Sequence, residues 1–268
     1  MNTITLIGCG WFGFPLATQL MKQGFQVKAS KRHPDDLAQL QQAGIEAYQL
    51  DLANVTTQVK KATLFDADAI VINLPPGLRR GETDYLGYLT QLKNLMGERQ
   101  YQKVIFISST GVYPSLNQTV TEQDAGAFND TRHTLLQAEA IFSAMANSCV
   151  VRFSGLVGPK RHPGRFFAGK TDVSGANVAV NLVHLDDCIA AVSLILSRTD
   201  TLPIYNLTAN EHPTRGAFYA AAAEHLGLIA PQFNQQQQPS KIIDGQLISH
   251  QLGFQYAFSS PFKMLDAC

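Results

Sequence analysis

The chain has 268 residues, in which 21 Lys and Arg balance 21 Asp and Glu, so its formal net charge is zero. Because the chain has no basic excess and no acidic tail, its composition gives no support for general nucleic-acid binding. Hydrophobic residues make up 45% of the chain and charged residues 16%, which predicts a full core beneath a weakly charged surface. At roughly 150 residues per domain, the length predicts one large or two small domains.

Cysteine spacing and the first residues of the chain indicate its compartment. The four cysteines form no C-x-x-C pair, so we expect neither a redox motif nor a metal site. Residues 1–8 are typical of a strand and not of a signal peptide, and no apolar stretch reaches the ~18 residues of a membrane helix. We therefore expect a cytoplasmic protein with reduced thiols and no membrane contact.

Apolar runs and helical periodicities alternate along roughly the first 150 residues. Strands are predicted at 4–7, 25–29, 47–50, 69–74, 104–107 and 149–153, and helices at 16–23, 35–43, 83–100 and 135–146. Such alternation builds βαβ units, so we predict an α/β fold with a doubly wound parallel Rossmann sheet of about seven strands.

Beyond residue 153 the alternation is interrupted. Residues 155–175 are rich in Gly, Pro and basic side chains, and a strand and a helix return at 180–196. An Ala-rich helix is predicted at 215–226, followed by an exposed Gln connector at 235–238. We expect these parts to form a small carboxyl-terminal lobe.

The segment Gly8-Cys9-Gly10-Trp11-Phe12-Gly13 follows the first predicted strand and opens the first predicted helix. This spacing in this context is typical of a dinucleotide-binding turn. Gly8 permits the tight turn, Gly10 lets the backbone approach a pyrophosphate, and Gly13 lets the helix pack closely. The free N–H groups of the helix N-terminus favour that anion, so we expect Trp11 and Phe12 to lie at the cofactor as well. A Gly-rich turn without a ligand is the alternative.

Ser30, Lys31 and Arg32 directly follow the second predicted strand, about 20 residues beyond Gly10. A site for NAD usually has Asp or Glu at this point, where it binds the ribose hydroxyls. One hydroxyl and two cations favour a 2′-phosphate, so we predict NADP, with NAD as the second possibility. An ordinary solvated basic turn would give the same residues.

Hydroxyl side chains gather where the fifth predicted strand ends, at Ser108, Ser109 and Thr110, with Tyr113 close behind. Ligands of such sheets bind beyond the carboxyl ends of the strands, so these groups could bind a carbonyl or an alcohol. A turn held by its own hydroxyl-to-backbone hydrogen bonds is an equal alternative.

A second polar segment, residues 156–167, combines cations with aromatic rings. Arg side chains bind carboxylates or phosphates through two parallel hydrogen bonds, so we predict a substrate-binding loop for a small anionic molecule. The residues expected at this loop are Arg161, His162, Arg165 and Phe166, with Leu156 at the cofactor. A solvated loop that packs its Phe residues on the core is the alternative.

His184 precedes Asp186 and Asp187, and a His beside carboxylates could transfer protons. We expect His184 at the substrate, whereas for the two Asp residues we favour N-caps of the following helix.

These motifs together resemble the extended short-chain dehydrogenase/reductase family of the NAD(P)-dependent epimerase and dehydratase type. The glycine turn, Asp51-Leu52, Ser108-Ser109 with Val112-Tyr113, Gly158-Pro159 and the segment 183–187 occur in the family's order. The resemblance implies that Asp51 and Leu52 lie at the adenine, that Leu74 and Pro75 line the adenosine, and that Ser109 is the catalytic hydroxyl. It also implies a possible homodimer through the helices at 83–100 and 135–146.

Two departures from the family pattern bear on activity. The usual G-x-x-G-x-x-G would need Gly at position 7, where this chain has Ile7. The turn thus also resembles the start of 3-hydroxyacid dehydrogenases, but their all-helical second domain has no counterpart here. More seriously, counting back from Glu139 places Thr131 and Leu135 where the family has the Tyr and Lys of Y-x-x-x-K. Loss of such acid–base groups typically costs 10²–10⁴-fold in rate.

The motifs divide the chain by role and leave two functions open. We assign 1–158 plus 180–199 to an NAD(P)-binding Rossmann domain, and 159–179 plus 200–268 to a small substrate-binding lobe. The first hypothesis is an oxidoreductase or epimerase that transfers hydride to or from a small anionic or sugar-type substrate, with Ser109, Thr131 and Tyr113 as candidate catalytic residues. The second is a catalytically inactive NADP(H)-binding sensor.

Overall fold

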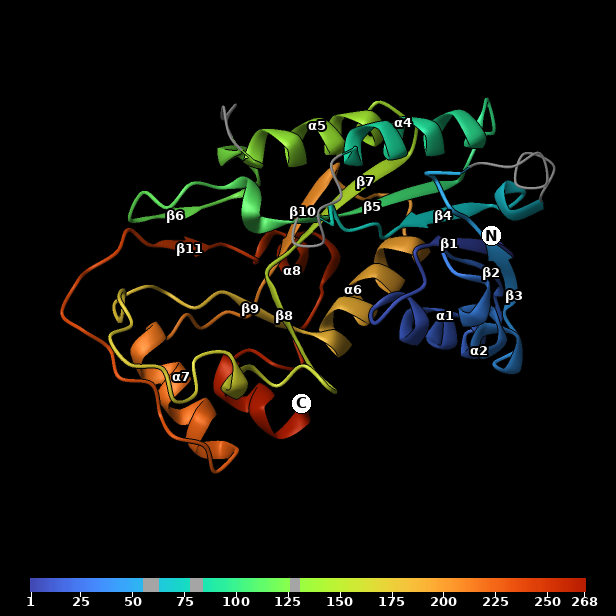
Figure 1. Ribbon diagram of the computed structural model, residues 1–268. Coiled ribbons are helices and arrows are strands. Elements are labelled where there is room, and N and C mark those ends of the chain that lie inside the picture. Colours follow the sequence, from blue (N-terminus) through green and yellow to red (C-terminus); the bar gives the residue numbers. More distant parts are fainter. Residues whose placement is uncertain (55–62, 78–83, 126–130) are drawn as a thin grey trace. The chain divides into compact units, whose positions relative to one another are not determined.

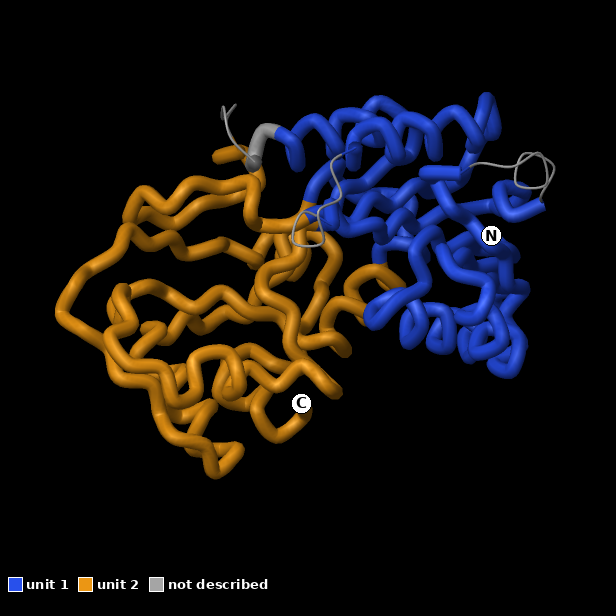
Figure 2. The backbone as a smooth tube through the Cα atoms, in the orientation of Figure 1, with its two compact units in different colours: residues 1–108, 127–151, 195–204 blue, residues 109–126, 152–194, 205–268 orange. Residues whose placement is uncertain are grey.

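The computed structural model describes residues 1–54, 63–77, 84–125 and 131–268, and for 131–133 it describes the backbone alone. The chain forms two compact units, coloured separately in Figure 2. Unit 1 comprises Met1–Ser108, Ala127–Val151 and Ile195–Ile204, and unit 2 comprises Ser109–Gly126, Arg152–Leu194 and Tyr205–Cys268. Each unit is therefore assembled from separate stretches of the sequence.

A seven-stranded sheet has the order β10-β7-β5-β4-β1-β2-β3, and its strands β1 to β4 lie wholly in unit 1 (Figure 1). The strands are β1 (Thr3–Ile7), β2 (Gln26–Lys31), β3 (Glu46–Gln49), β4 (Ala69–Ile72), β5 (Lys103–Ser109), β7 (Ser148–Phe153) and β10 (Ile204–Leu207). The pairs β1–β2, β1–β4, β2–β3 and β4–β5 run parallel. The predicted doubly wound Rossmann sheet is confirmed, since strand order reverses beside β1.

Helices cover both faces of this sheet. In Figure 1, α4 (Tyr85–Met96) and α5 (Thr131–Ser143) lie on one side, and α1 (Gly13–Lys22) and α2 (Leu37–Gln42) lie on the other. All four residues of β4 are buried, as a strand covered on both faces requires. A core that includes Ile72, Leu89, Phe106 and Phe142 fills the layer below α4 and α5.

The predicted helix boundaries differ from the observed ones in two instructive places. The segment predicted as one helix at 35–43 is a 3₁₀ turn, η1 (Pro34–Asp36), followed by α2, a common arrangement at helix N-termini. The helix predicted at 83–100 is α4, which Asp84 caps by accepting from the N–H of Gly87, and which ends at Gly97 with φ of +62°. Thr83 lies outside the described residues.

Unit 2 contains two short parallel ladders. One pairs β8 (Gly155–Val157) with β9 (Leu182–His184), and the other pairs β6 (Gln118–Val120) with β11 (Lys241–Ile243). Its helices are α6 (Leu185–Ser197), of which residues to 194 belong to this unit, α7 (Arg215–His225) and α8 (Leu247–Leu252). Strands of three residues are too short to show a period of two, so the sequence did not reveal β6, β8 or β11.

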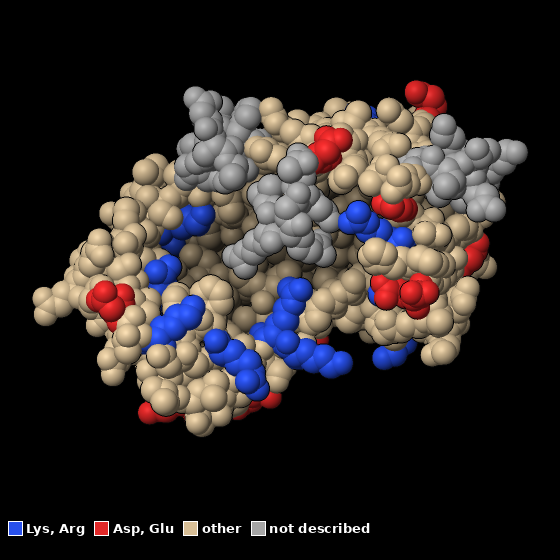
Figure 3. Space-filling view, in the orientation of Figure 1, with Lys and Arg blue, Asp and Glu red and all other residues tan. Residues whose placement is uncertain are grey.

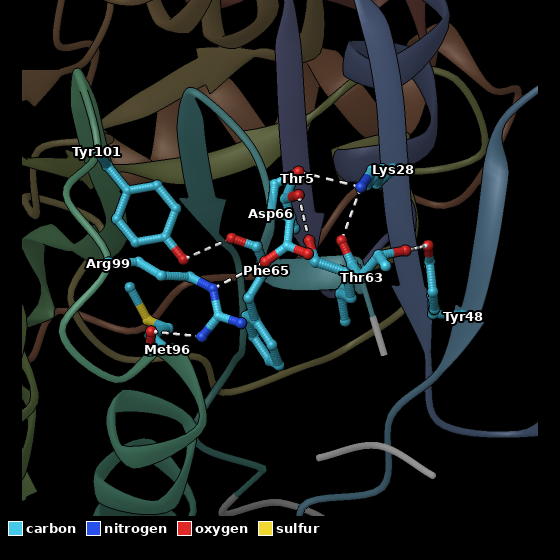
Figure 4. Close-up of polar contacts among 10 residues, drawn as sticks. Thr5, Lys28, Tyr48, Thr63, Phe65, Asp66, Met96, Arg99 and Tyr101 are labelled. Carbon is cyan, nitrogen blue, oxygen red and sulfur yellow. Dashed lines mark hydrogen bonds and ion pairs between the residues drawn. The ribbon is translucent and has the colours of Figure 1, made fainter. Parts of the chain in front are cut away.

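A network of polar contacts holds the turn before β4 against the edge of unit 1 (Figure 4). The Lys28 ammonium donates to the carbonyls of Thr63 and Asp66, at 2.7 and 3.0 Å. Arg99 forms an ion pair with Asp66 at 2.9 Å, and the Tyr101 hydroxyl donates to the carbonyl of Phe65 at 3.0 Å. These bonds satisfy carbonyls that a short 3₁₀ turn leaves without partners, and they place the start of β4 beside β1.

No helix among the described residues is both long and apolar enough to cross a membrane.

Candidate functional site

The glycine turn after β1 has a different steric reason for each of its three glycines. Gly8 has φ of +88°, and a Cβ there would lie 2.3 Å from the carbonyl oxygen of Asn73. A Cβ on Gly13 would lie 2.8 Å from the carbonyl oxygen of Gly8, so α1 begins in close contact with the turn. A Cβ on Gly10 would meet nothing within 4 Å. The open space above Gly10 fits an approaching diphosphate, as the spacing of the glycines predicts.

Two side chains fasten this turn to the neighbouring strands. The Ser30 hydroxyl accepts from the N–H of Gly8 at 3.3 Å, and the carbonyl of Ser30 accepts from the N–H of Cys9 at 3.0 Å. The Asn73 side-chain amide donates to the carbonyl of Gly8 at 3.1 Å. Ser30 is 3% exposed, so in this structure its hydroxyl shapes the turn from inside. We did not single out Asn73 from the sequence, although a polar residue directly after a fully apolar strand is a usable signal.

The cations predicted to bind a 2′-phosphate lie at the end of β2. Burial raises the pKa of the Cys9 thiol to about 12, and the charge of Lys31 opposes that rise. The N–H of Cys9 donates to the carbonyl of Ser30, so Lys31 directly follows the residue of β2 that is bonded to the glycine turn. Arg32 is exposed and pairs with Asp51 at 3.4 Å. The Asn54 amide, the N–H of Ala53 and the Arg32 guanidinium together lower the pKa of Asp51. Asp51 thus holds Arg32 at the rim of unit 1.

The residues expected along the adenosine lie on segments that follow strands of unit 1. Leu52 is buried, Leu74 is half-buried and Pro75 is exposed. The Tyr85 hydroxyl of α4 donates to the carbonyl of Leu74 at 2.9 Å, and burial raises the pKa of this phenol. Tyr85 therefore positions the segment after β4, a role that its place inside an amphipathic helix did not reveal.

Ser108 ends the part of β5 that belongs to unit 1, and its hydroxyl donates to Oε1 of Glu139 at 2.5 Å. Glu139 is 5% exposed and lies on α5, one helical turn beyond Leu135. A charge-assisted hydrogen bond of this length is among the stronger kinds. The side chain of Thr131, a predicted catalytic residue, lies outside the described residues.

Ser109 begins unit 2 and caps a 3₁₀ turn, η4 (Thr110–Val112), by accepting from the N–H of Gly111 at 3.0 Å. The Lys241 ammonium of β11 donates to the carbonyls of Thr110 and Tyr113, at 3.0 and 2.5 Å. The turn that carries the predicted catalytic hydroxyl is thus held by a residue 132 positions later in the chain. The alternative of a locally bonded hydroxyl turn is present in this structure, and Ser109 remains half-buried.

Tyr113 lies inside a buried polar network of unit 2 and is 1% exposed. Its hydroxyl donates to the Asn206 side chain at 2.7 Å and accepts from Arg152 at 2.6 Å. Arg152 also donates to the carbonyl of Glu122, whose carboxylate accepts from the N–H of Asn206. With its hydroxyl engaged on both sides and away from solvent, Tyr113 has a structural role here, which speaks against its use as a substitute acid.

The basic loop of unit 2 is largely exposed. Arg161, Arg165 and Phe166 are exposed, His162 is half-buried, and the half-buried Leu156 lies on β8. The N–H of Arg161 donates to the carbonyl of Gly158 at 2.8 Å, which closes a tight turn before the cations. Lys170 lies 5.4 Å from the Phe166 ring centre. Figure 3 shows Lys and Arg side chains gathered on the visible face of this unit.

The segment 184–187 is organised differently from our expectation. The prediction that Asp186 or Asp187 caps α6 is wrong for Asp187, which is 1% exposed and accepts from the N–H groups of Ala257 and Phe258, at 2.7 and 3.2 Å. The residue that accepts from the first turn of α6 is His184, whose Nδ1 bonds the N–H of Asp186 at 3.2 Å. Local sequence favours a cap, but tertiary contact with the tail determines the Asp187 partner.

His184 is 1% exposed, and its Nε2 lies 3.2 Å from the carbonyl of Ala267. Both ring nitrogens are therefore bonded to backbone within unit 2. His184 therefore links β9 to the carboxyl-terminal residues through its hydrogen bond with Ala267. Within the described ranges, no cluster of three or more His, Cys, Asp or Glu side chains is arranged to hold a metal ion.

A family model described as NAD(P)H-binding matches residues 8–184, which is more than half of the chain. The match begins at Gly8, the first glycine of the turn described above. The chain belongs to the NAD(P)H-binding family. The prediction of an NAD(P)-binding protein is therefore confirmed at the level of the family.

Protein YeeZ of Escherichia coli strain K12 is 38% identical to this chain over 273 residues, covering 98% of this chain and 99% of that protein. Protein YeeZ of Escherichia coli O157:H7 matches to the same extent. The likeness thus spans both units of this NAD(P)H-binding protein.

Solved structures share the fold over nearly the whole chain. UDP-glucuronic acid 4-epimerase of Bacillus cereus, in complex with NAD, has a TM-score of 0.78 at 17% identity and covers 99% of this chain and 94% of its own. The human epimerase family protein SDR39U1 with NADPH has a TM-score of 0.76 at 17% identity and covers 98% and 97%. A conserved protein of unknown function from Silicibacter pomeroyi scores 0.76 at 20% identity, covering 100% and 98%. These structures confirm the fold that the resemblance implies, and the family model confirms NAD(P)H binding.

Proposed function

We propose that this NAD(P)H-binding protein is an NADP(H)-dependent oxidoreductase or epimerase that acts on a small anionic or sugar-type substrate by hydride transfer. The observation that carries the proposal is the glycine turn, in which Gly8 and Gly13 are closely packed while the space above Gly10 is open. Such a turn at a helix N-terminus attracts a diphosphate through backbone N–H groups and the helix dipole.

Support for NADP over NAD comes from the end of β2. Lys31 directly follows Ser30, which is bonded to the turn, and Arg32 is exposed at the same rim. A guanidinium binds a phosphate through paired hydrogen bonds, which Asp51 does not prevent because one carboxylate occupies part of a five-donor group. One of the similar solved structures holds NAD and another holds NADPH, so the preference for NADP rests on the two cations of this chain.

Support for an anionic substrate comes from the basic loop of unit 2. Arg161 and Arg165 are exposed on it, beside the half-buried His162 and the exposed ring of Phe166. The Bacillus cereus neighbour is named for UDP-glucuronic acid, a sugar nucleotide with a carboxylate. We propose that Ser109 binds the substrate oxygen and that the two arginines bind its negative charge.

Proton transfer in such a reaction needs a group that replaces the missing Tyr and Lys. NADP, when bound, would accept or return the hydride. We propose that Glu139 supplies this group, because its buried carboxylate already accepts a hydrogen bond from the Ser108 hydroxyl at 2.5 Å.

The first test compares cofactors. Titration calorimetry should give tighter binding of NADP⁺ than of NAD⁺, and the variant Lys31→Met with Arg32→Met should lose that preference by about tenfold or more, as two charge-assisted hydrogen bonds predict. Lys22→Met, at the end of α1, is the control. Equal affinity for both dinucleotides in the unaltered protein would exclude the NADP assignment.

Stopped-flow reduction of bound NADP⁺ across sugar nucleotides, small alcohols and aldehydes then tests catalysis. Glu139→Gln should slow hydride transfer by 10²–10⁴-fold at neutral pH while leaving NADP⁺ affinity unchanged. If none of these compounds reduces the bound NADP⁺, the proposed hydride transfer is wrong and a second candidate function is favoured.

That second candidate is a protein that binds NADP(H) and reports its state without turnover. Leu135 favours it, since a Leu in place of the family's Lys can neither hold a ribose hydroxyl nor influence a neighbouring proton. Tight NADP(H) binding without any turnover would support this function, and absence of dinucleotide binding would exclude both.

A further inference from the structure

A chain of hydrogen bonds joins three side chains of unit 2 that lie outside the proposed chemistry. His162 Nε2 lies 3.1 Å from Nδ1 of His225, the last residue of α7. His225 Nε2 lies 3.0 Å from Oδ1 of Asp266, in the 3₁₀ helix η7 (Pro261–Ala267). The two imidazole rings stack with centroids 5.1 Å apart and an interplanar angle of 16°. Three separate segments of the unit are therefore linked at one point.

The hydrogen bond between Gly164 and His162 determines which atom is the donor in each of the other bonds of this chain. The N–H of Gly164 donates to Nδ1 of His162 at 3.0 Å, so Nδ1 carries a lone pair and neutral His162 has its proton on Nε2. His162 must then donate to Nδ1 of His225, which leaves the His225 proton on Nε2, facing Asp266. Both rings are thus held in the Nε2–H tautomer.

An additional proton cannot enter the pair without breaking a bond. A proton on Nδ1 of His162 would face the N–H of Gly164, and a proton on Nδ1 of His225 would face the N–H of His162. The chain is also unsuited to proton conduction, because its inner end meets a backbone amide, which does not take up or release protons at ordinary pH. The hydrogen-bonded pair can fix the position of a loop, but it cannot deliver protons to a reaction.

The loop that it holds is the basic one. Gly164 lies against α7, where an added Cβ would be 2.0 Å from the carbonyl oxygen of Ala222. The turn η6 (Pro163–Arg165) is capped by His162 itself. Arg161 precedes His162 and Arg165 lies at the end of η6, so both cations belong to the loop that His162 caps.

We propose that His225 and Asp266 are positioning residues for His162 and its loop, and that protonation of the His pair releases the loop from α7. The positioning itself does not depend on the proposed function. The consequence that anion binding on this loop weakens in mild acid does rest on that function.

The charges around the pair indicate where release occurs. Burial lowers the pKa of His162 below its ordinary value of 6.5, and His225 and Arg165 lower it further. On the outer side, the carboxylate of Asp266, which is 86% exposed, faces Nε2 of His225 at 3.0 Å. The bonded state therefore persists at neutral pH and is lost as the pH falls below about 6.5.

The test uses the full chain and the ¹⁵N and ¹H signals of its imidazoles and of the Gly164 amide, followed from about pH 8 to about pH 5. We expect both rings as Nε2–H tautomers near neutral pH, one shared transition below it, and a roughly fivefold or greater rise in Gly164 amide exchange beyond that expected from pH alone. An Nδ1–H tautomer on His162, or two independent titrations, would overturn the proposal.

Variants separate positioning from a merely structural role. His162→Asn keeps an acceptor for Gly164 but does not titrate, so the pH response of that amide should disappear. Asp266→Asn keeps the acceptor for His225 but removes the charge, so the transition should move to lower pH with the tautomers unchanged. His250→Asn, an exposed His on α8, should behave like the unaltered protein. A Gly164 response that persists in His162→Asn, or spectra altered by added Zn²⁺ at these rings, would contradict the assignment.

The effect on ligand binding is measured separately, with inorganic diphosphate as the probe and the Gly164 amide signal as the readout, so that diphosphate bound at the glycine turn is not counted. Its affinity should fall between about pH 7 and pH 5 in the unaltered protein, and should fall less in His162→Asn. If diphosphate does not bind while the spectra behave as expected, the positioning stands and the anion-binding part of the proposed function fails.

Discussion

Single glycines of one turn have opposite sensitivities to an added side chain. Gly8 combines φ of +88° with a neighbour at 2.3 Å from its ideal Cβ, so both its backbone and its surroundings require glycine. An ideal Cβ on Gly10 would meet no atom within 4 Å. We therefore expect glycine to be required at this position by the ligand and not by the fold.

We expect Gly10→Val to lower NADP(H) affinity by tenfold or more, since the side chain enters the space of the diphosphate, while the thermal midpoint changes little. Gly8→Ala is the contrast, with a loss of at least about 1–2 kcal/mol in the free energy of unfolding. Calorimetric titration and thermal unfolding of both variants measure this. Equal loss of stability in the two variants would contradict the assignment.

At the scale of elements, the short ladder β6–β11 brings the tail of the chain to the Ser109 turn. This pairing positions Lys241, because the register of the ladder places Lys241 opposite Gln118. From there the Lys241 ammonium donates to the carbonyls of Thr110 and Tyr113. Half-buried carbonyls without a donor are costly, so a single flexible side chain stabilises the whole turn.

Lys241→Met keeps the length of the side chain and removes its donors, so we expect a loss of about 1–3 kcal/mol in the free energy of unfolding. The amide of Gly111, which Ser109 caps, should also exchange faster. Urea unfolding and amide exchange measure the two effects, with the exposed Lys263→Met as the control. Identical behaviour of both variants would show that Lys241 does not hold the turn.

For the whole molecule, the half-buried His212 makes stability depend on pH. Burial lowers the pKa of His212, whose Nδ1 is buried without a hydrogen-bond partner among the described residues. Below about 6.5 the unfolded chain binds a proton at this position more readily than the folded chain does. Stability is therefore full above that pH and declines as the pH falls. The raised pKa values of Glu122 and Asp187 act in the opposite sense at lower pH.

We expect the free energy of unfolding to fall more steeply between about pH 7 and pH 5 in the unaltered protein than in His212→Asn, by at most about 1.4 kcal/mol per pH unit. Urea unfolding at several pH values gives both curves, and His250→Asn should follow the unaltered one. Parallel curves for His212→Asn and the unaltered protein would show that His212 does not contribute.

The sequence alone was sufficient for the Rossmann sheet, the glycine turn and the cations at the end of β2. These features depend on local chemistry, namely apolar periodicity, the steric freedom of glycine, and charges close to each other in the chain. For the same reason the cofactor class could be inferred before any contact was known, and the family model confirms it.

Tertiary structure decided which residues hold those features in place. Asn73 on Gly8, Lys241 on the Ser109 turn, the tail amides on Asp187 and the His162–His225–Asp266 chain all join positions far apart in sequence. A side chain's hydrogen-bond partner is determined by which segments the fold packs together, and no periodicity or spacing records that. Tyr113 and His184 appeared reactive by type, yet burial against distant partners makes them structural in this protein.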